Sequence, residues 1–425
     1  MNFKDKRDNR SNRDSNENKG LSTFFASCPR EMEGLLEEEI LDHGITNIEI
    51  KKGGILFKTD DFSGIKFLLN SRIASRVYKS FAFLKIKNER DLYESAKTQP
   101  WEKILDLKQT FKITTLFDMT AKSFFKNSIA VSQILKDALV DHFRDIYNER
   151  PSVDTENPDM GLLLRLESPE NKNGWNASIF IDMCGDALSN RGYRKSGHQA
   201  PLRENLAAAI VLSTDWNPEE DLFIDTMCGT GTLLIEAILI KGNIPPAYLR
   251  VKRYIERNEK SFAFLKQKWF LEKTYVTKDT KKYLQDIYNH CLEAFNKLEE
   301  FQFFGNDIDK KNLDLCEEHL FNAWIPDGIV TLSHNDATRF YPEEIEAPGV
   351  VICNPPYGER MNSKESLEDL YHNYGENLKK NYKGFRGYIF TSDQELRKKI
   401  ALQTSKRIPF YNGNIECRLL RYELR

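Results

Sequence analysis

The sequence predicts an α/β protein in which a doubly wound, mostly parallel sheet follows smaller α+β modules. From Leu188 onward, apolar runs typical of strands alternate with amphipathic runs typical of helices, the pattern of a parallel sheet covered by helices. A turn containing Gly229 and Gly231 separates the first of these strands from its helix. Near the end, Asn412-Gly413 lies between two apolar runs and predicts a hairpin, which adds an antiparallel strand at one edge of the sheet.

The first part of the chain predicts a tail followed by α+β structure. Residues 1–20 are polar, carry charges of both signs and lack the apolar run of a secretory signal, so we expect a disordered tail. A short strand and an amphipathic helix ending at Gly44 come next, then a hairpin around Gly53-Gly54, a helix and another strand. Between about residues 91 and 182, we expect a strand, an amphipathic helix and two strands joined by a polar loop.

The second part repeats the order strand, turn and helix. Residues 241–300 are long for one crossover between strands and consist of charged, helix-like segments, so we expect a helical insertion there. The predicted units are strand, turn and helix at 221–240 and 301–323, strand and loop at 328–340, strand and turn at 349–360, strand and helix at 386–400, and a hairpin at 406–424.

The composition of the chain limits which classes of protein it can belong to. The chain has 425 residues, 40% of them apolar, which suits two or three domains with their own cores. Charges interrupt every apolar run, so we expect no membrane span. The net charge of −2 means that any nucleic-acid surface must be local. The seven cysteines are scattered without a C-x-x-C pair, which argues against disulfides and a zinc site; we expect no metal and a reduced, cytoplasmic location.

The glycine turn predicts a ligand site at the carboxyl ends of the strands. Leu234 stands where a dinucleotide fingerprint has its third glycine, and Asp225 would repel a pyrophosphate. Acids at three successive strand ends, Asp225, Asp307 and Asp336, fit a cationic ligand such as S-adenosyl-L-methionine, although each could also be a solvated loop acid. Asp225 would face the methionine end, Asp307 the ribose hydroxyls and Asp336 the adenine amine. The predicted cofactor-binding residues are Asp225, Cys228, Gly229, Gly231, Thr232, Asp307, Ile308, Asp336, Ala337 and Asn354.

The stretch "CNPPYG" ends a predicted buried strand and suits methylation of an amine attached to an aromatic ring. Such an amine is a poor nucleophile because its lone pair is delocalised into the ring. The side-chain oxygen of Asn354 and the carbonyl of Pro355 would hold its hydrogens and direct the lone pair toward the methyl group. Pro356 stiffens the turn, and Tyr357 could stack on an extruded base. Cys353 is interpreted as a core residue and not as a nucleophile. The alternative is an ordinary exit from a strand.

These motifs, in this order, resemble the class I methyltransferases that modify exocyclic amines. The stretches "FFASCPREMEGLLEEEI", "DMCGDALSNRGYRKSGHQAPLRENLAAAIV", "DTMCGTGTLLIEA", "GNDID" and "CNPPYGER" are similar to the bacterial 23S ribosomal RNA guanine-N2 methyltransferases that carry a THUMP domain. The resemblance implies a ferredoxin-like module at 21–64, a THUMP RNA-binding domain at 65–182 and a Rossmann-like class I methyltransferase domain at 183–425.

The resemblance also implies an RNA-contacting segment at the entry to the catalytic domain. Arg191, Tyr193, Arg194 and Lys195 form the densest basic and aromatic cluster, suited to phosphates and bases, and are the predicted RNA-binding residues. These arginines could instead pair with helix carboxylates such as Glu204. In the predicted insertion, the basic residues at 250–253 could touch a phosphate backbone or form a solvated helix face.

The function that the resemblance implies is methylation of a guanine N2 amine in 23S ribosomal RNA, free or in a ribosomal assembly intermediate. N6-adenine methylation of DNA, guanine-N2 methylation of transfer RNA, and a catalytically silent RNA-binding assembly protein stay open as alternatives. The turn at Asn354 does not separate guanine from adenine, since both bases carry an exocyclic amine. In the large fused enzymes of the family a second methyltransferase follows; the sequence ends at Arg425, so we expect no activity of that second half. The oligomeric state is left open.

Overall fold

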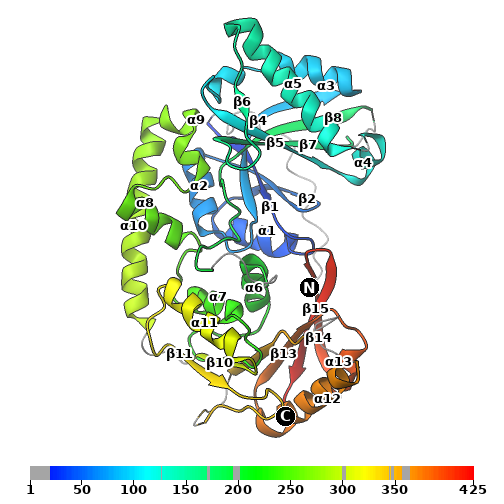
Figure 1. The fold of residues 1–425 in the computed structure, drawn as a ribbon, viewed down its shortest axis with the longest axis vertical. Helices are drawn as coiled ribbons and strands as arrows, with labels where there is room; N and C mark the ends of the chain where they lie inside the picture. Colours follow the sequence, from blue (N-terminus) through cyan, green and yellow to red (C-terminus); the bar gives the residue numbers. More distant parts are fainter. Residues whose placement is uncertain are drawn as a thin grey trace, which may run out of the picture.

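A computed structural model shows two sheets, one in each half of the molecule (Figure 1). It describes residues 20–125, 127–169, 173–194, 202–298, 303–343, 345, 349–356 and 364–425. The tail predicted at 1–20 lies outside the described residues except for Gly20. Within the described part, no helix is both long and apolar enough to cross a membrane.

The N-terminal half is built on one eight-stranded sheet with the strand order β2-β3-β1-β4-β8-β7-β5-β6. Strand β4 pairs with β1 on one side and with β8 on the other, so the two predicted α+β modules share a continuous sheet. The strands are β1 Ser22–Ser27, β2 Asn47–Lys51, β3 Gly54–Thr59, β4 Arg76–Ile86, β5 Thr110–Phe117, β6 Ser152–Val153, β7 Met160–Glu167 and β8 Trp175–Asp182. The helices are α1 Glu33–Asp42, α2 Asp61–Asn70, α3 Glu89–Lys97, α4 Met119–Phe125 and α5 Ser128–Tyr147.

Alternation along these strands explains the core of this half. Phe24 and Ala26 of β1 are fully buried, as are Val131 and Ala138 on the predicted apolar face of α5. A strand points successive side chains to opposite faces, so every second residue meets the helices. The hairpin predicted around Gly53-Gly54 is confirmed by the pairing of β2 with β3.

The C-terminal half contains a seven-stranded sheet with the order β11-β10-β9-β12-β13-β15-β14. Strands β9 to β13 are parallel, which confirms the predicted alternation. The predicted closing hairpin is also confirmed: β15 is antiparallel to β13, and β14, antiparallel to β15, forms the edge. The strands are β9 Leu222–Asp225, β10 Phe303–Asp307, β11 Val330–His334, β12 Gly349–Cys353, β13 Arg386–Thr391, β14 Thr404–Asn412 and β15 Ile415–Glu423. The helices are α6 Glu204–Leu212, α7 Thr232–Lys241, α8 Tyr248–Arg257, α9 Lys268–Leu271, α10 Thr274–Asn296, α11 Lys310–Asn322, α12 Lys364–Asn381 and α13 Leu396–Lys399.

Helices α8 to α10 occupy the segment predicted as a helical insertion and connect the two halves. Helix α10 packs on α2 of the N-terminal half, and Figure 1 shows the two helices next to each other. Tyr283 accepts a hydrogen bond of 2.7 Å from Asn70, and Lys273 lies 2.6 Å from Asp61. The insertion therefore fixes the N-terminal half to the C-terminal half. Helix α12 was not among the predicted elements.

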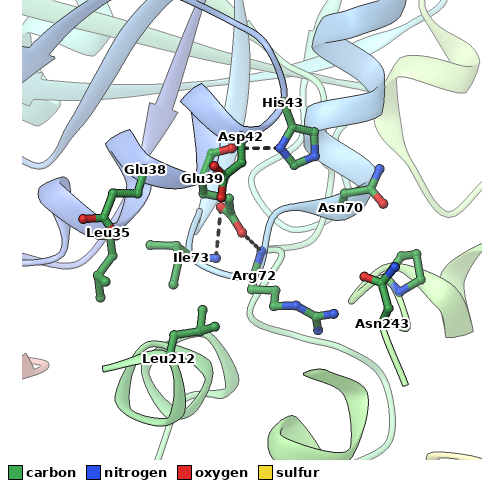
Figure 2. Close-up of a pocket in the computed structure, with 11 residues that line it drawn as sticks. Leu35, Glu38, Glu39, Asp42, His43, Asn70, Arg72, Ile73, Leu212 and Asn243 are labelled. Carbon is green, nitrogen blue, oxygen red and sulfur yellow. Dashed lines mark hydrogen bonds between the residues drawn. The ribbon is translucent and has the colours of Figure 1, made fainter. Parts of the chain in front are cut away.

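A second connection between the halves surrounds a cavity of about 380 Å³ (Figure 2). The Arg72 guanidinium donates to the carbonyl oxygens of Leu239 at 3.1 Å and Ile244 at 2.9 Å, next to the end of α7. Glu39 on α1 accepts from the Arg72 main-chain N–H at 2.6 Å, and burial raises the pKa of the Glu39 carboxyl. This charged network holds α1 and the loop after α2 against the C-terminal half.

Candidate active site

A cavity of about 440 Å³ lies at the carboxyl ends of the parallel strands, where ligands bind in open α/β sheets. Its size is within the range of small-molecule sites. It is lined by Leu202, Asp225, Thr226, Met227, Cys228, Gly229, Thr230, Thr232, Leu233, Asp307, Ile308, Asp309, Asn312, Asp336, Ala337, Asn354, Pro356, Leu370 and Asn412. Of the ten predicted cofactor-binding residues, all but Gly231 line this cavity. Among the described residues, no group of three or more His, Cys, Asp or Glu is arranged to hold a metal ion.

The two glycines of the turn between β9 and α7 have different roles. Gly229 has a φ of +54° and Gly231 a φ of +81°, the left-handed region that glycine adopts without strain. A Cβ on Gly229 would meet nothing within 4 Å, so the turn is open toward the cavity there. A Cβ on Gly231 would lie 2.4 Å from the Cys316 sulfur of α11. Gly229 therefore leaves room for a ligand, whereas Gly231 permits close packing of α11.

Asp225 is the buried acid of the cavity, with 1% of its surface exposed. Burial raises the pKa of its carboxyl to about 8, and the nearby Asp307 contributes to the same increase. The Met227 N–H donates to it at 3.3 Å and acts in the opposite direction. Among the described residues Asp225 has no cationic partner, and such a buried carboxyl favours its neutral form. A cation that enters the cavity would favour the ionised carboxylate instead and pair with it.

Asp307 holds the glycine turn in place. One carboxylate oxygen accepts from the Gly229 N–H at 2.9 Å, and the other accepts from the Asp309 N–H at 2.9 Å and the Asn312 amide at 3.1 Å. A carboxylate has about four lone-pair positions, so it can still accept from a ligand hydroxyl. Ile308 beside it is 71% exposed.

Asp336 and Ala337 form the far end of the cavity, after β11. Asp336 is exposed, and its Oδ1 accepts from the Thr338 N–H at 2.9 Å and the Thr338 hydroxyl at 2.8 Å. Ala337 is buried. The structure thus brings together all three acids predicted from the strand ends, in an order that follows the sheet from β9 to β11.

Asn306 is an organising residue that the sequence reasoning missed. It is fully buried, and its amide donates to the carbonyls of Thr226 and Asn335, each at 3.0 Å. Its oxygen accepts from the Asn335 N–H at 3.0 Å. One side chain therefore ties the ends of β9, β10 and β11 together. The available signal was an amide directly before Asp307 at the end of a strand.

Asn354 differs from every other polar group in the cavity. Its side-chain oxygen is buried and has no hydrogen-bond partner among the described residues. An unsatisfied buried acceptor is costly, so this oxygen is available to a donor on a ligand. Pro356 lines the cavity, while Pro355 is buried and does not. Tyr357, the predicted stacking residue, lies outside the described residues.

Cys353 is fully buried at the end of β12. Burial raises the pKa of its thiol far above the ordinary value. A thiol that stays protonated is a poor nucleophile, in agreement with its interpretation as a core residue. The Cys228 thiol, which lines the cavity, also has a raised pKa, because it is hydrogen-bonded to Cys316 and buried.

The predicted RNA-binding cluster is largely internal. The prediction that Arg191 and Tyr193 bind RNA is contradicted, because their side chains are 1% and 0% exposed. The Arg191 Nε lies 3.3 Å from the Glu236 carboxylate of α7, and its Nη2 donates to the Arg72 carbonyl at 2.8 Å. A dense run of basic residues indicated an RNA surface, but a carboxylate 45 residues later takes up the charge of Arg191. Lys195 lies outside the described residues.

Arg194 lies behind the cavity wall and contacts two of the residues that line it. Its Nη2 donates to the Thr232 hydroxyl and to the Leu202 carbonyl, each at 2.5 Å, and both of these residues line the cavity. Its Nη1 lies 3.5 Å from the Glu204 carboxylate, the pairing that was the alternative to RNA binding. Arg194 thus packs next to the site through Thr232 and Leu202.

The basic residues of the insertion are also engaged in the fold. Arg250 is 3% exposed, donates to the Cys184 carbonyl at 2.5 Å and stacks on Phe262 at 4.1 Å. Lys252 lies 3.2 Å from the Trp324 ring centre. Arg250 is thus buried in the fold, and Lys252 is half-buried against Trp324.

Family comparisons agree with this architecture. Residues 191–421 match the family described as "RMKL-like, methyltransferase domain". Residues 87–168 match the THUMP domain, and residues 23–78 match the RlmL ferredoxin-like domain. The resemblance drawn from the motifs is confirmed by these matches.

Individual proteins resemble the chain over nearly its whole length. The ribosomal RNA large subunit methyltransferase K/L of Allochromatium vinosum is 33% identical over 408 residues, which cover 94% of this chain and 51% of that protein. The chain therefore spans about half the length of the curated relatives it matches. A solved structure described as a possible methylase from Clostridium difficile 630 has a TM-score of 0.76 at 28% identity, covering 95% of this chain and 98% of that one. The methyltransferase SMU.472, complexed with SAH, has a TM-score of 0.76 at 24% identity and covers 96% of this chain and 99% of that one.

Proposed function

The chain belongs to the RMKL-like methyltransferase family, and from that premise we propose that it transfers a methyl group from S-adenosyl-L-methionine to the N2 amine of a guanine in 23S ribosomal RNA. The observation that carries the proposal is the unsatisfied oxygen of Asn354 at the wall of the strand-end cavity. The names of the curated relatives and the match to a THUMP domain support ribosomal RNA as the substrate.

The residues of the cavity fit S-adenosyl-L-methionine, which supplies a methyl group on a positively charged sulfur when bound. Asp225 offers a carboxylate that has no cationic partner among the described residues, which suits the positive charges of the donor. Gly229 leaves open space beside the glycine turn. Asp307 and Asp336, further along the sheet, would accept from the ribose hydroxyls and the adenine amine. Support for this cofactor also comes from the SAH that is bound in the related SMU.472 structure.

Asn354 would act on the acceptor amine. Its oxygen accepts one N–H of the amine, and the main-chain carbonyl of Pro355 is the second acceptor that we propose. With both hydrogens held, the nitrogen lone pair is withdrawn from the ring and points at the methyl group. No strong base is needed, because the proton leaves the nitrogen after the methyl group has been transferred. The fixed φ of two successive prolines keeps these acceptors in place.

The alternative substrates differ from the proposed one in the base that is methylated or in the nucleic acid that carries it. Adenine in DNA presents a similar exocyclic amine, and Asn354 alone does not distinguish it from guanine. The THUMP match favours RNA over DNA, and the curated relatives favour ribosomal over transfer RNA. A catalytically silent RNA-binding protein would not be expected to keep both Asp225 and an unsatisfied Asn354 at one cavity.

Nucleoside analysis tests the proposal. Ribosomal RNA from cells with and without the gene is digested, and N2-methylguanosine is measured by mass spectrometry. We expect deletion to lower N2-methylguanosine in 23S RNA and the wild-type gene to restore it. An unchanged amount, or a change confined to N6-methyladenine or to transfer RNA, would refute the proposed substrate.

A further inference from the structure

Tyr374 is a buried tyrosine whose hydroxyl contacts the ends of two neighbouring strands. It belongs to α12, which comes after Asn354 in the chain and packs on the C-terminal sheet (Figure 1). Only 2% of its surface is exposed, and it does not line the strand-end cavity. Burial raises the pKa of the hydroxyl well above its ordinary value, so the group stays protonated and acts through hydrogen bonds.

The Tyr374 hydroxyl joins the end of β9 to the end of β12. It lies 2.7 Å from the hydroxyl of Thr226, the residue directly after β9. It is also hydrogen-bonded to the thiol of Cys353, the last residue of β12. Both partners are fully buried. Because water does not reach these groups, the loss of the tyrosine hydroxyl would leave them without that partner.

Each partner is next to a residue with a proposed role in methyl transfer. Asp225, the proposed counter-charge of the donor, directly precedes Thr226. Asn354, the proposed acceptor of an amine hydrogen, directly follows Cys353. The two strands are neighbours, and Asp225 is opposite Ile352 in their parallel pairing. One hydroxyl thus bridges the two stretches of main chain that carry the donor-side acid and the acceptor-side amide.

The main chain at Thr226 strengthens the same link. Its N–H donates to the Ile352 carbonyl at 3.0 Å, and its carbonyl accepts from the buried Asn306 amide at 3.0 Å. The Thr226 hydroxyl donates to the Ile352 carbonyl at 3.4 Å. A threonine hydroxyl has one hydrogen, so in this arrangement Tyr374 is the donor in the bond between the two hydroxyls. A phenylalanine at position 374 would therefore remove a donor from the junction of β9 and β12.

From these contacts we propose that Tyr374 is a positioning residue for methyl transfer, and that its hydroxyl sets where Asn354 lies relative to the bound donor. The inference rests on the proposed function. Transfer needs the amine nitrogen close to the methyl group and in line with it, and a displacement of about 1 Å can cost about 100-fold in rate. The donor itself would still bind, because Asp307 and the glycine turn are held by other hydrogen bonds.

Tyr374→Phe tests the proposal, because it removes the hydroxyl and keeps the ring. Single-turnover transfer to 23S ribosomal RNA from cells that lack the gene is measured at saturating donor, and donor affinity is measured by calorimetry. We expect the rate to fall about 10-fold and the dissociation constant for S-adenosyl-L-methionine to change by less than about twofold.

Tyr248→Phe is the matched control. Tyr248 on α8 is as buried as Tyr374, and its hydroxyl donates to the Ala323 carbonyl at 2.6 Å. The control thus removes a buried tyrosine hydroxyl that has no contact with β9 or β12 among the described residues. It should keep the wild-type rate and donor affinity, even where its melting temperature falls by as much as that of Tyr374→Phe.

Two further comparisons separate positioning from general stability. Thr226→Val removes the partner hydroxyl and should slow transfer about as much as Tyr374→Phe, whereas Thr226→Ser keeps a hydroxyl and should restore most of the rate. In the background of Asn354→Ala, Tyr374→Phe should cause no further loss of rate. A residue that acts through Asn354 has nothing left to position once that amide is removed.

Each outcome bears on a different claim. If Tyr374→Phe transfers at the wild-type rate, or slows transfer by the same factor with and without Asn354, Tyr374 does not position Asn354 and the proposed function stands. A loss confined to donor affinity would overturn the inference in the same way. If Tyr374→Phe does not fold, equal rates for Thr226→Val and Thr226→Ser would overturn it. If the wild type binds the donor but methylates no 23S RNA, the proposed function fails and this inference fails with it.

Discussion

The proposed donor half of the cavity, at the ends of β9 to β11, and the proposed acceptor half, at Asn354, differ in how their polar groups are satisfied. On the donor side, Asp307 accepts three hydrogen bonds from its own chain, and Asn306 joins three strand ends. On the acceptor side, the Asn354 oxygen has no partner among the described residues. Asp307 and Asn306 are thus satisfied by the fold, whereas the Asn354 oxygen is left for a ligand. The comparison teaches that one cavity can combine polar groups held rigidly by the protein, where the methyl donor is proposed to bind, with a polar group left without a partner, where the acceptor amine is proposed to bind.

The largest expected effect tests the acceptor half. Asn354→Ala should lower the rate of methyl transfer by at least about 100-fold, by analogy with the loss of a preorganised polar contact, and should leave donor affinity nearly unchanged. Single-turnover kinetics and calorimetry measure the two quantities. Asn289→Ala, an exposed amide on α10, is the matched control. Unchanged turnover would show that Asn354 has no role in the mechanism. A large loss of donor affinity would show that Asn354 contributes to donor binding, which contradicts its assignment to the acceptor half.

The next effect tests the donor half. Asp307→Ala removes the acceptor of the Gly229 N–H and frees the turn. We expect the dissociation constant for S-adenosyl-L-methionine to rise about 10- to 100-fold, since a charged acceptor is lost from both the turn and the ligand. Asp309→Ala is a useful comparison, because Asp309 also lines the cavity but caps α11. Equal calorimetric affinity for the Asp307 variant and the wild type would contradict the donor assignment.

The smallest effect concerns the charge of Asp225. With a pKa of about 8, its carboxyl is mostly neutral below pH 8 and ionised above it. A cationic donor binds the ionised form better, so affinity should rise with pH from 6.5 to 8, by at most about tenfold per unit. Titrations of the wild type and Asp225→Asn over this range isolate the effect. The same pH slope in both proteins would show that Asp225 is not the counter-charge.

The sequence predicted the donor half better than the acceptor half for a topological reason. Asp225 and Asp307 end parallel strands, and Asp336 follows another by two residues. The carboxyl ends of such strands meet at one edge, so locating the strands locates the acids. Asn354 followed from the same rule. Asn412, which also lines the cavity, did not, because its position depends on how far the β14–β15 hairpin extends beyond β13, which is set by pairing register.

The sequence pattern around each residue also did not predict which charged side chains are buried. The cluster around Arg191 has the composition of an RNA surface, but Glu236 on α7 faces it in the folded protein. Nothing near Arg191 in the sequence indicates that pairing. Arg250 illustrates the same point, since its guanidinium is surrounded by main-chain carbonyls from distant loops.

A crystal structure with S-adenosylhomocysteine tests the central claim most directly. The account predicts the product at the strand-end cavity, with its amino-acid part beside Asp225, its ribose at Asp307, and its sulfur facing the Asn354 oxygen. That oxygen should remain without a partner from the protein. A product bound elsewhere, or an Asn354 amide turned into a hydrogen bond with the protein and away from the sulfur, would contradict the account.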